Sequence, residues 1–343
     1  MILELWVEKL LVSTNKMLNK EMSLVDDLKK PEMKAMRDGY GEGLVEAGKR
    51  DEKVVVLTAD LAESTRANLF AKEFEERFFD LGVAEQNLMG VAAGMALSGK
   101  TPFVSSYGVF SPGRNWEQLR VSVCYSKTNV KIAGAHVGFS ASADGATHQA
   151  LEDMAITRAL PNLIVLAPCD YEQVKKAVLA SSQIKGPVYI RHHKLKAACV
   201  TTSVTPFEIG KAQVFREGKD VSVFTCGPMV YRALKVAEKL KGKVDVEVVN
   251  IHTIKPVDRE GIIRSVRKTG RVVTVEEHQI TGGLGSAVAE VLAEELPTQM
   301  KRVGVRDTFG ESGEYDDLLA KYGLGEKDIM RAIDSVVNKP LER

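Results

Sequence analysis

The chain has 343 residues, in which 47 Lys and Arg nearly balance 46 Asp and Glu. Its 44% apolar and 27% charged residues match an ordinary globular protein and exclude a disordered or collagen-like chain. The net charge of +1 gives no bulk attraction to nucleic acid or to an anionic membrane, so we expect neither as a partner. The four cysteines show no CxxC spacing, which argues against a zinc site and a disulfide framework. Glu4 and Glu8 lie where a signal peptide is basic and then apolar, so the sequence predicts a cytoplasmic protein.

Residues 1–32 are predicted to form a helical extension in front of the first domain. Pro31 ends this segment, because the residue that precedes a proline disfavours the helical conformation. The apolar residues that recur at helical spacing are Leu3, Trp6, Val7, Leu10 and Leu11.

Residues 33–197 alternate short β-rich runs with helical patterns, which predicts a parallel sheet with helices on both faces. The expected strands are 54–57, 103–105, 131–133, 164–167 and 188–191. The expected helices cover residues 35–50, 85–98, 115–126, 149–159 and 171–184.

A linker over residues 198–208, rich in Thr and Ser, separates this domain from a second alternating set over residues 209–343. Its expected strands are 221–225, 244–250, 272–275 and 302–305. Its expected helices are 229–241, 258–268, 284–296 and 326–337. The predicted fold class is α/β, with two domains that each contain a mainly parallel sheet flanked by helices.

Polar residues follow the predicted strands of the first domain, and ligands bind beyond the carboxyl ends of strands in open parallel sheets. Asp, Ser, Tyr, His and Arg side chains at four strand ends therefore predict one polar site. For any single residue, an ordinary polar loop is an equally good interpretation.

The helix at 85–98 begins with Glu85, which either interacts with the helix dipole or places a carboxyl group in a buried site. Gly90 and Gly94 lie inside this helix, where each costs roughly 1 kcal/mol relative to Ala. A helix accepts this cost where another backbone approaches closely, so we expect a packed interface there.

The segments GVAEQNLMG, ADLAES and SADGATHQALED, in this order and spacing, resemble the C-terminal half of transketolase. The resemblance covers residues 33–340 and implies a pyrimidine-binding domain followed by the transketolase C-terminal domain. The first segment is shared across thiamine-diphosphate enzymes, and ADGATHQ is shared by transketolases and deoxyxylulose-phosphate synthases. The position of His136, eight residues before Asp144, resembles transketolase more than the synthase.

The resemblance implies thiamine diphosphate as cofactor. It implies that Glu85 bonds a ring nitrogen of the aminopyrimidine and that Phe110 stacks on this ring, with Tyr107 beside it. Asp60 is expected as a further cofactor contact. A buried carboxyl group of this kind can hold or share a proton with the cofactor, so Glu85 is an expected catalytic residue.

For the substrate, the resemblance implies a sugar phosphate. Arg37, Ser64, His136 and Arg191 are expected at the phosphate, since arginines form directional bonds to phosphate oxygens. Asp144 is expected to bind a sugar hydroxyl, and His148 to lie near the reacting carbons as the second catalytic residue. Surface charge and a simple turn are the alternative interpretations of Arg37 and Asp144.

The Gly-Asp-Gly motif that binds diphosphate and metal in this family does not occur in the sequence. We therefore expect no metal ligands in this chain, and a partner subunit that holds Mg²⁺ or Ca²⁺. The expected partner is an N-terminal transketolase subunit, in an α2β2 assembly with a second copy of this chain. The resemblance thus implies transfer of a two-carbon ketol unit between ketose and aldose phosphates in pentose phosphate metabolism.

Three other functions remain open at this point. The chain could be the beta chain of a 2-oxo-acid dehydrogenase, although an unphosphorylated substrate needs no set of basic residues. It could resemble deoxyxylulose-phosphate synthase in activity. It could also be a non-catalytic paralogue that only assembles with partners, against which Glu85, Asp144 and His148 argue together.

The resemblance also implies that the C-terminal domain takes part in dimer packing and has no direct catalytic role.

Overall fold

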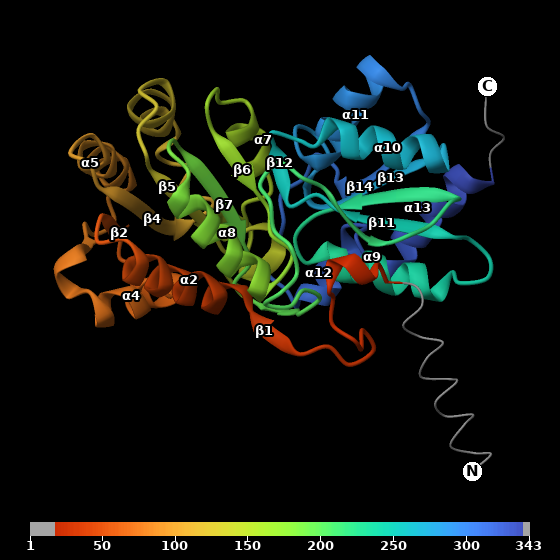
Figure 1. Cartoon of the computed structure of the whole chain (residues 1–343), viewed down its shortest axis with the longest axis horizontal. Helices are drawn as coiled ribbons and strands as arrows, with labels where there is room; N and C mark the ends of the chain where they lie inside the picture. The colour runs from red at the N-terminus through yellow and green to blue at the C-terminus, as the bar shows by residue number, and fades with distance from the viewer. Residues whose placement is uncertain (1–17, 339–343) are drawn as a thin grey trace, which may run out of the picture.

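Two mainly parallel sheets organise residues 18–338, the part of the chain that the computed structural model describes (Figure 1). The first sheet has seven strands in the order β12-β6-β7-β5-β4-β2-β3. Its strands are β2 (Val54–Thr58), β3 (Phe78–Asp80), β4 (Thr101–Tyr107), β5 (Lys131–Ala135), β6 (Ile164–Leu166), β7 (Val188–His192) and β12 (Thr253–Lys255). All neighbouring pairs are parallel except β12, which runs antiparallel to β6.

Helices cover both faces of this sheet, as its sequence requires. Successive residues of a strand face opposite sides, so Val54 and Val56 pack on one core cluster and Val55 and Leu57 on another. The main helices are α2 (Met36–Arg50), α5 (Glu85–Leu97), α7 (Asp153–Arg158) and α8 (Tyr171–Gln183). Shorter ones are α3 (Ala62–Thr65), α4 (Asn68–Glu73), η2 (Glu75–Arg77), α6 (Trp116–Gln118), η3 (Leu119–Tyr125), η4 (Gly138–Asp144) and η5 (Ala146–His148).

The second sheet has five strands in the order β14-β13-β10-β11-β9. They are β9 (Gln213–Arg216), β10 (Val221–Thr225), β11 (Val246–Asn250), β13 (Val272–Gln279) and β14 (Met300–Val305), of which β9 is antiparallel. The helices are α9 (Met229–Lys239), α10 (Arg259–Thr269), α11 (Leu284–Glu295), α12 (Tyr315–Lys321) and α13 (Glu326–Val337). Within residues 18–338, none of the helices combines the length and apolar character needed to cross a membrane.

The predicted α/β fold class is confirmed, and each expected strand has its counterpart in the described part of the chain. Two helices differ from expectation. The helix expected at 149–159 is shortened to α7, and the one at 115–126 is divided into α6 and the π-helical η3. Strand β12 was not expected. It follows β11 of the second domain in sequence, yet it forms the edge of the first sheet by pairing Thr253 with Leu166.

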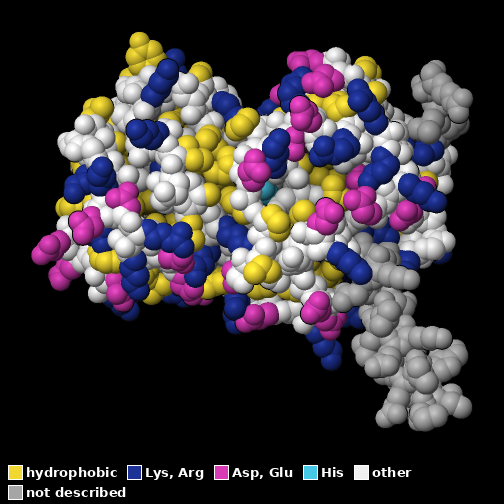
Figure 2. All heavy atoms as spheres, viewed as in Figure 1, with side chains coloured by type: hydrophobic (Ala, Val, Ile, Leu, Met, Phe, Trp, Pro, Cys, Tyr) yellow, Lys and Arg dark blue, Asp and Glu magenta, His cyan; other side chains and the backbone are white. Residues whose placement is uncertain are grey.

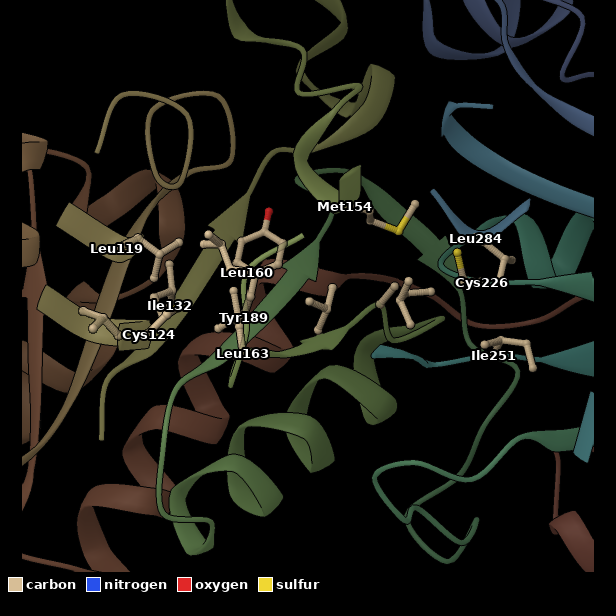
Figure 3. Packing of buried hydrophobic residues seen from close by; sticks show 14 of the residues in the cluster. Leu119, Cys124, Ile132, Met154, Leu160, Leu163, Tyr189, Cys226, Ile251 and Leu284 are labelled. Carbon is tan, nitrogen blue, oxygen red and sulfur yellow. The ribbon is translucent and has the colours of Figure 1, made fainter. Parts of the chain in front are cut away.

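The two domains also share one apolar core. Leu119, Ile132 and Leu163 of the first domain belong to the same buried cluster as Ile251 and Leu284 of the second (Figure 3). Burial of apolar area that is continuous between domains opposes their relative motion, because separating them would expose it to water.

The expected helical extension is not present in residues 18–32, and the apolar residues that predicted it lie outside the described residues. Only a short 3₁₀ helix, η1 (Lys20–Met22), lies in this segment. The main-chain N–H of Asn19 instead donates to the Phe215 carbonyl of edge strand β9 at 3.0 Å. Leu18, Met22, Leu24 and Leu28 pack against the core of the second domain. The chain then reaches the first domain through β1 (Met33–Ala35), which pairs with β8 (Lys196–Ala198).

A buried ion pair lies where the two sheets meet. Arg191, in β7, donates from Nε to both carboxylate oxygens of Asp153, at 3.1 and 2.8 Å, and from Nη2 to the Glu277 carbonyl of β13 at 2.8 Å. The side chains of Arg191 and Asp153 are 3% and 1% exposed. Tyr189 donates its hydroxyl to the same carboxylate at 2.8 Å. The guanidinium group of Arg191 thus joins β7 and α7 of the first domain to β13 of the second domain.

We expect Arg191→Ala to lower the free energy of unfolding by about 3–5 kcal/mol, because it leaves the Asp153 carboxylate buried without its partner. Denaturant unfolding of the full chain measures this loss. Arg259→Ala is the control, since it removes exposed ion pairs with Glu294 and Glu295 and should leave the unfolding midpoint almost unchanged. Equal midpoints for the two variants would contradict a structural role of the buried pair.

Candidate active site

The candidate site lies at the carboxyl ends of β4, β5 and β7, which end side by side. The register pairs Tyr107 with Ala135 and Ala135 with His192. Residues that follow these positions therefore lie within one or two strand spacings of each other, with β5 in the middle. Figure 2 shows charged side chains spread over both domains. On the face seen in that figure, apolar side chains gather toward the middle, where the domains meet.

Four aromatic rings form a cluster in this site. The rings of Tyr107 and His136 stack, with centroids 3.9 Å apart and an interplanar angle of 19°. Phe110 lies parallel to Tyr107 at 5.9 Å, and His148 meets the edge of Phe110 at 5.4 Å. The structure thus brings together four residues that the sequence predicted, from two strand ends and the segment after β5.

His136 presents unused hydrogen-bonding atoms inside this cluster. It is fully buried, has a positive φ of 58°, and neither ring nitrogen has a hydrogen-bond partner among residues 18–338. Burial is the main cause that lowers the pKa of His136 to about 2, and nearby basic groups that include Lys194 and Arg37 contribute. The imidazole is therefore neutral and has one N–H donor and one acceptor available for a ligand. Unmade bonds of this kind are costly, which favours a ligand that completes them.

Glu85 is a buried carboxylate at the start of α5, next to the rings. Its side chain is 3% exposed, and both of its oxygens accept from Nη1 of Arg114 at 3.0 Å. The Arg114 guanidinium lies over the Phe110 ring, 4.8 Å from its centroid, and is half exposed. Asn115 donates to the Glu85 carbonyl at 3.1 Å. Glu85 and Phe110 are thus adjacent through one arginine, which the sequence analysis did not identify although it follows the aromatic loop directly.

Two basic side chains, Arg37 and Lys194, lie near the His136 ring. Arg37, in the first turn of α2, donates from Nη1 to the Ser64 carbonyl at 3.1 Å. Its Nε is buried and has no hydrogen-bond partner among residues 18–338. Lys194, just after β7, places its Nζ 3.5 Å from Oδ2 of Asp144 and remains one-third exposed. These side chains give the site positive charge beside a neutral imidazole.

Two predicted site residues do not join this group. Arg191 directs its guanidinium to Asp153 and to the second domain, so its donors are used inside the protein. The partly exposed basic group at the end of β7 is instead Lys194, which faces Asp144 and which the sequence pattern did not indicate. Asp60 is exposed with a φ of 59°, and its main-chain N–H donates to the Asp80 carboxylate at 2.9 Å.

The glycines of α5 face open space in this chain. A Cβ at Gly90 or Gly94 would have no atom within 4 Å. The same region exposes Leu97 at 75% and Tyr125, at the end of η3, at 82%. The close backbone contact that the glycines predict is therefore not made within residues 18–338, and the face is open to another chain.

Comparisons with known proteins identify both domains of the chain. The transketolase pyrimidine-binding domain matches residues 32–198, and the transketolase C-terminal domain matches residues 210–329. The chain is 46% identical to a putative transketolase C-terminal section of Methanocaldococcus jannaschii, over 89% of this chain and 97% of that protein. It is 42% identical to a 6-deoxy-6-sulfo-D-fructose transketolase subunit of a Clostridium species, over 89% and 95% of the two chains. A solved structure described as a split-gene transketolase, inactive beta4 tetramer, matches with a TM-score of 0.82 and 47% identity, over 90% and 99% of the two chains.

The buried histidines predict that acid destabilises the fold. Burial lowers the pKa of five of them: His136, His192, His193, His252 and His278. Below about pH 6.5 the unfolded chain binds protons at these groups that the folded chain does not, so stability falls as pH falls. Burial raises the pKa of Glu276 and Glu277 to about 7 and also raises the pKa of Glu152 and Asp170, which acts in the opposite direction but involves four groups against the five histidines.

We therefore expect the thermal unfolding midpoint to drop between about pH 7 and pH 5. His252→Leu, which lies outside the site and stacks on Phe207, should reduce this dependence on pH. A midpoint that rises on acidification would show that the buried carboxyl groups with raised pKa values outweigh the histidines.

Proposed function

This chain belongs to the transketolase family as a C-terminal section, and we propose that it is one subunit of a split, thiamine-diphosphate-dependent enzyme that transfers a two-carbon ketol unit between sugar phosphates. The observation that carries the proposal is the buried Glu85 carboxylate beside the Phe110 ring, in one site with His136 and basic side chains. A carboxylate and an aromatic face next to each other fit a flat, polar, nitrogen-containing ring.

The residues present suit the aminopyrimidine half of thiamine diphosphate. Phe110 offers a partly exposed ring for stacking, and Glu85 offers carboxylate oxygens that can hold a proton toward a ring nitrogen. When bound, thiamine diphosphate supplies a carbon nucleophile for the ketol group. Arg114 now occupies the Glu85 carboxylate, so the arginine must share or leave it when a ring nitrogen bonds there. The further contact of Asp60 stays a proposal.

For the sugar, the arrangement favours Arg37, Lys194 and His136 at the phosphate, with Ser64 beside Arg37. Lys194 replaces Arg191 in this proposal, because Arg191 is buried in the domain contact. Asp144, next to Lys194, is placed to accept from a sugar hydroxyl. His148 meets the edge of Phe110, and we propose that it lies near the reacting carbons and moves a proton as the second catalytic residue.

A partner subunit completes the proposed enzyme. Among residues 18–338, no three His, Cys, Asp or Glu side chains are grouped so that they could hold a metal ion. We therefore propose that an N-terminal transketolase subunit binds the diphosphate with Mg²⁺ or Ca²⁺. The open α5 face, with Gly90 and Gly94, supports contact with another chain, and we propose two copies of each subunit, acting in the cytoplasm on the sugars of pentose phosphate metabolism.

A sulfonated sugar is the second candidate substrate, because a related subunit is described as a 6-deoxy-6-sulfo-D-fructose transketolase. Sulfonate and phosphate oxygens accept hydrogen bonds from the same donors, so Arg37, Lys194 and His136 can serve either anion. The same basic groups argue against an oxo-acid dehydrogenase beta chain, whose substrate carries no such anion. A non-catalytic role would leave the buried Glu85 and the unpaired His136 without a use.

We expect Arg37→Ala and Lys194→Ala, each mixed with the partner subunit, to raise the KM for xylulose 5-phosphate by about tenfold, because each removes binding made in both ground and transition states. Hydroxypyruvate, which has no phosphate, should be affected far less. Steady-state ketol transfer with both donors, and with sulfofructose, measures the difference. Lys175→Ala is the control, since this lysine pairs with Glu46 on the outer helices.

Two results would count against this account. If the wild-type mixture transfers no ketol unit from xylulose 5-phosphate, hydroxypyruvate or sulfofructose, the proposed function is contradicted. Equal increases of KM for xylulose 5-phosphate and hydroxypyruvate would contradict the assignment of these side chains to the phosphate.

A further inference from the structure

The segment from 136 to 149 carries half of the side chains that the proposed function directs to the substrate, and it contacts the second domain. His136, Asp144 and His148 all lie in it. It consists of short 3₁₀ turns, η4 and η5, with few internal bonds to fix its shape. Its position therefore depends on what packs around it.

Glu277, in β13 of the second domain, makes the most buried of the contacts between the second domain and this segment. Its Oε1 accepts from the main-chain N–H of Phe139 at 2.5 Å, and its Oε2 accepts from the Tyr315 hydroxyl at 2.5 Å. Gly138 has a φ of 60°, and a Cβ there would lie 2.3 Å from Glu277 Oε1. The glycine thus allows the carboxylate to approach the segment closely.

The same glutamate contacts the end of β7. Nε2 of His193 lies 3.4 Å from Glu277 Oε2, and the Glu277 carbonyl accepts from Arg191. Lys194 follows directly, and its main-chain N–H donates to Oγ of Ser140, inside η4, at 3.3 Å. Glu277 therefore lies between the two segments that carry the proposed substrate ligands Asp144 and Lys194.

Two further bonds join this segment to the loop after β14. Gln149 donates from Nε2 to the Glu311 carbonyl at 2.9 Å, and the Gly313 N–H donates to the Ser142 carbonyl at 3.2 Å. Both lie nearer the surface than the Glu277 contact, which is fully buried.

We propose that Glu277 is a positioning residue through which the C-terminal domain sets the alignment of the 136–149 segment with Lys194 for the substrate. This inference rests on the proposed function for its effect on catalysis. It gives the C-terminal domain a part in substrate binding, in addition to packing. Glu277 touches no reacting atom and acts through the Phe139 main chain and His193.

The hydrogen-bonding pattern indicates which substitution preserves this role. A glutamine at 277 can accept from the Phe139 N–H through its oxygen and donate to the Tyr315 oxygen through its amide. An alanine leaves the Phe139 N–H buried without a partner. The adjacent Glu276 is an equally buried control, because its carboxylate accepts from Leu284 and Gly285 at the start of α11, within the second domain.

In the mixture with the partner subunit, we expect Glu277→Ala to raise the KM for xylulose 5-phosphate about tenfold with a smaller change in kcat, because the bond lost is at Phe139, nearer in the chain to His136 and Asp144 than to the catalytic His148. Glu277→Gln should restore most of the wild-type KM. Glu276→Ala should lower the thermal unfolding midpoint and leave this KM unchanged. A KM that is unchanged in Glu277→Ala, or raised equally by Glu276→Ala, would overturn the proposal.

Amide hydrogen exchange of the full chain alone provides a test that does not depend on activity. Glu277→Ala should speed exchange in residues 136–149, and Glu276→Ala should not. Absence of ketol transfer by the wild-type mixture would remove the proposed function but would leave this exchange result decisive for the Glu277 contact. If Glu277→Ala fails to fold, Tyr315→Phe removes one bond to the same carboxylate without a large cavity. It should speed exchange in the segment, and unchanged exchange would overturn the proposal.

Discussion

The contact between the end of β7 and strand β13 determines how the two domains meet, and the site depends on it. Arg191 bridges Asp153 of the first domain and the Glu277 carbonyl of the second, out of reach of water. Charges buried in this way must remain paired, since a lone buried ion costs several kcal/mol. The arrangement fixes β13 against the first sheet, and Glu277 then holds the segment after β5 at a defined place. Domain contact and site geometry are therefore parts of one polar network.

The electrostatics of the site follow from the same burial. His136 is neutral because burial, aided by nearby basic groups, lowers its pKa, so it offers hydrogen bonds without adding a further positive charge. In the proposed function Arg37 and Lys194 supply the charge for an anionic group, whereas Glu85 contacts the rings through Arg114 over Phe110. A negative end and a polar ring can thus be bound at separate places in one site. The open face of α5 leaves room for another chain close to Glu85.

The sequence predicted the sheets because strand alternation follows simple rules, and the family resemblance named four rings, Tyr107, Phe110, His136 and His148, that the fold brings together. It did not predict the use of Arg191, although period-two alternation places this residue on the same face as Tyr189, and both donate to Asp153. Arg114 was missed because its partner Glu85 lies 29 positions away. Strand β12 was missed because it has only three residues, which follow β11 of the second domain in sequence but form an edge of the first sheet. Residues 18–32 follow the edge of β9, an interaction with distant residues that local spacing does not reveal.

In the proposed enzyme, this chain supplies the pyrimidine side of a cofactor site that a second subunit completes. The most direct measurement is ketol transfer from xylulose 5-phosphate, with saturating thiamine diphosphate and Mg²⁺, by the purified chain alone and mixed with an N-terminal transketolase subunit, beside a mixture containing Glu85→Gln. We predict no transfer by the chain alone, transfer by the wild-type mixture, and a loss of about 100-fold or more in the Glu85→Gln mixture at an unchanged unfolding midpoint. Full activity of the chain alone, or wild-type turnover with Glu85→Gln, would contradict the claim.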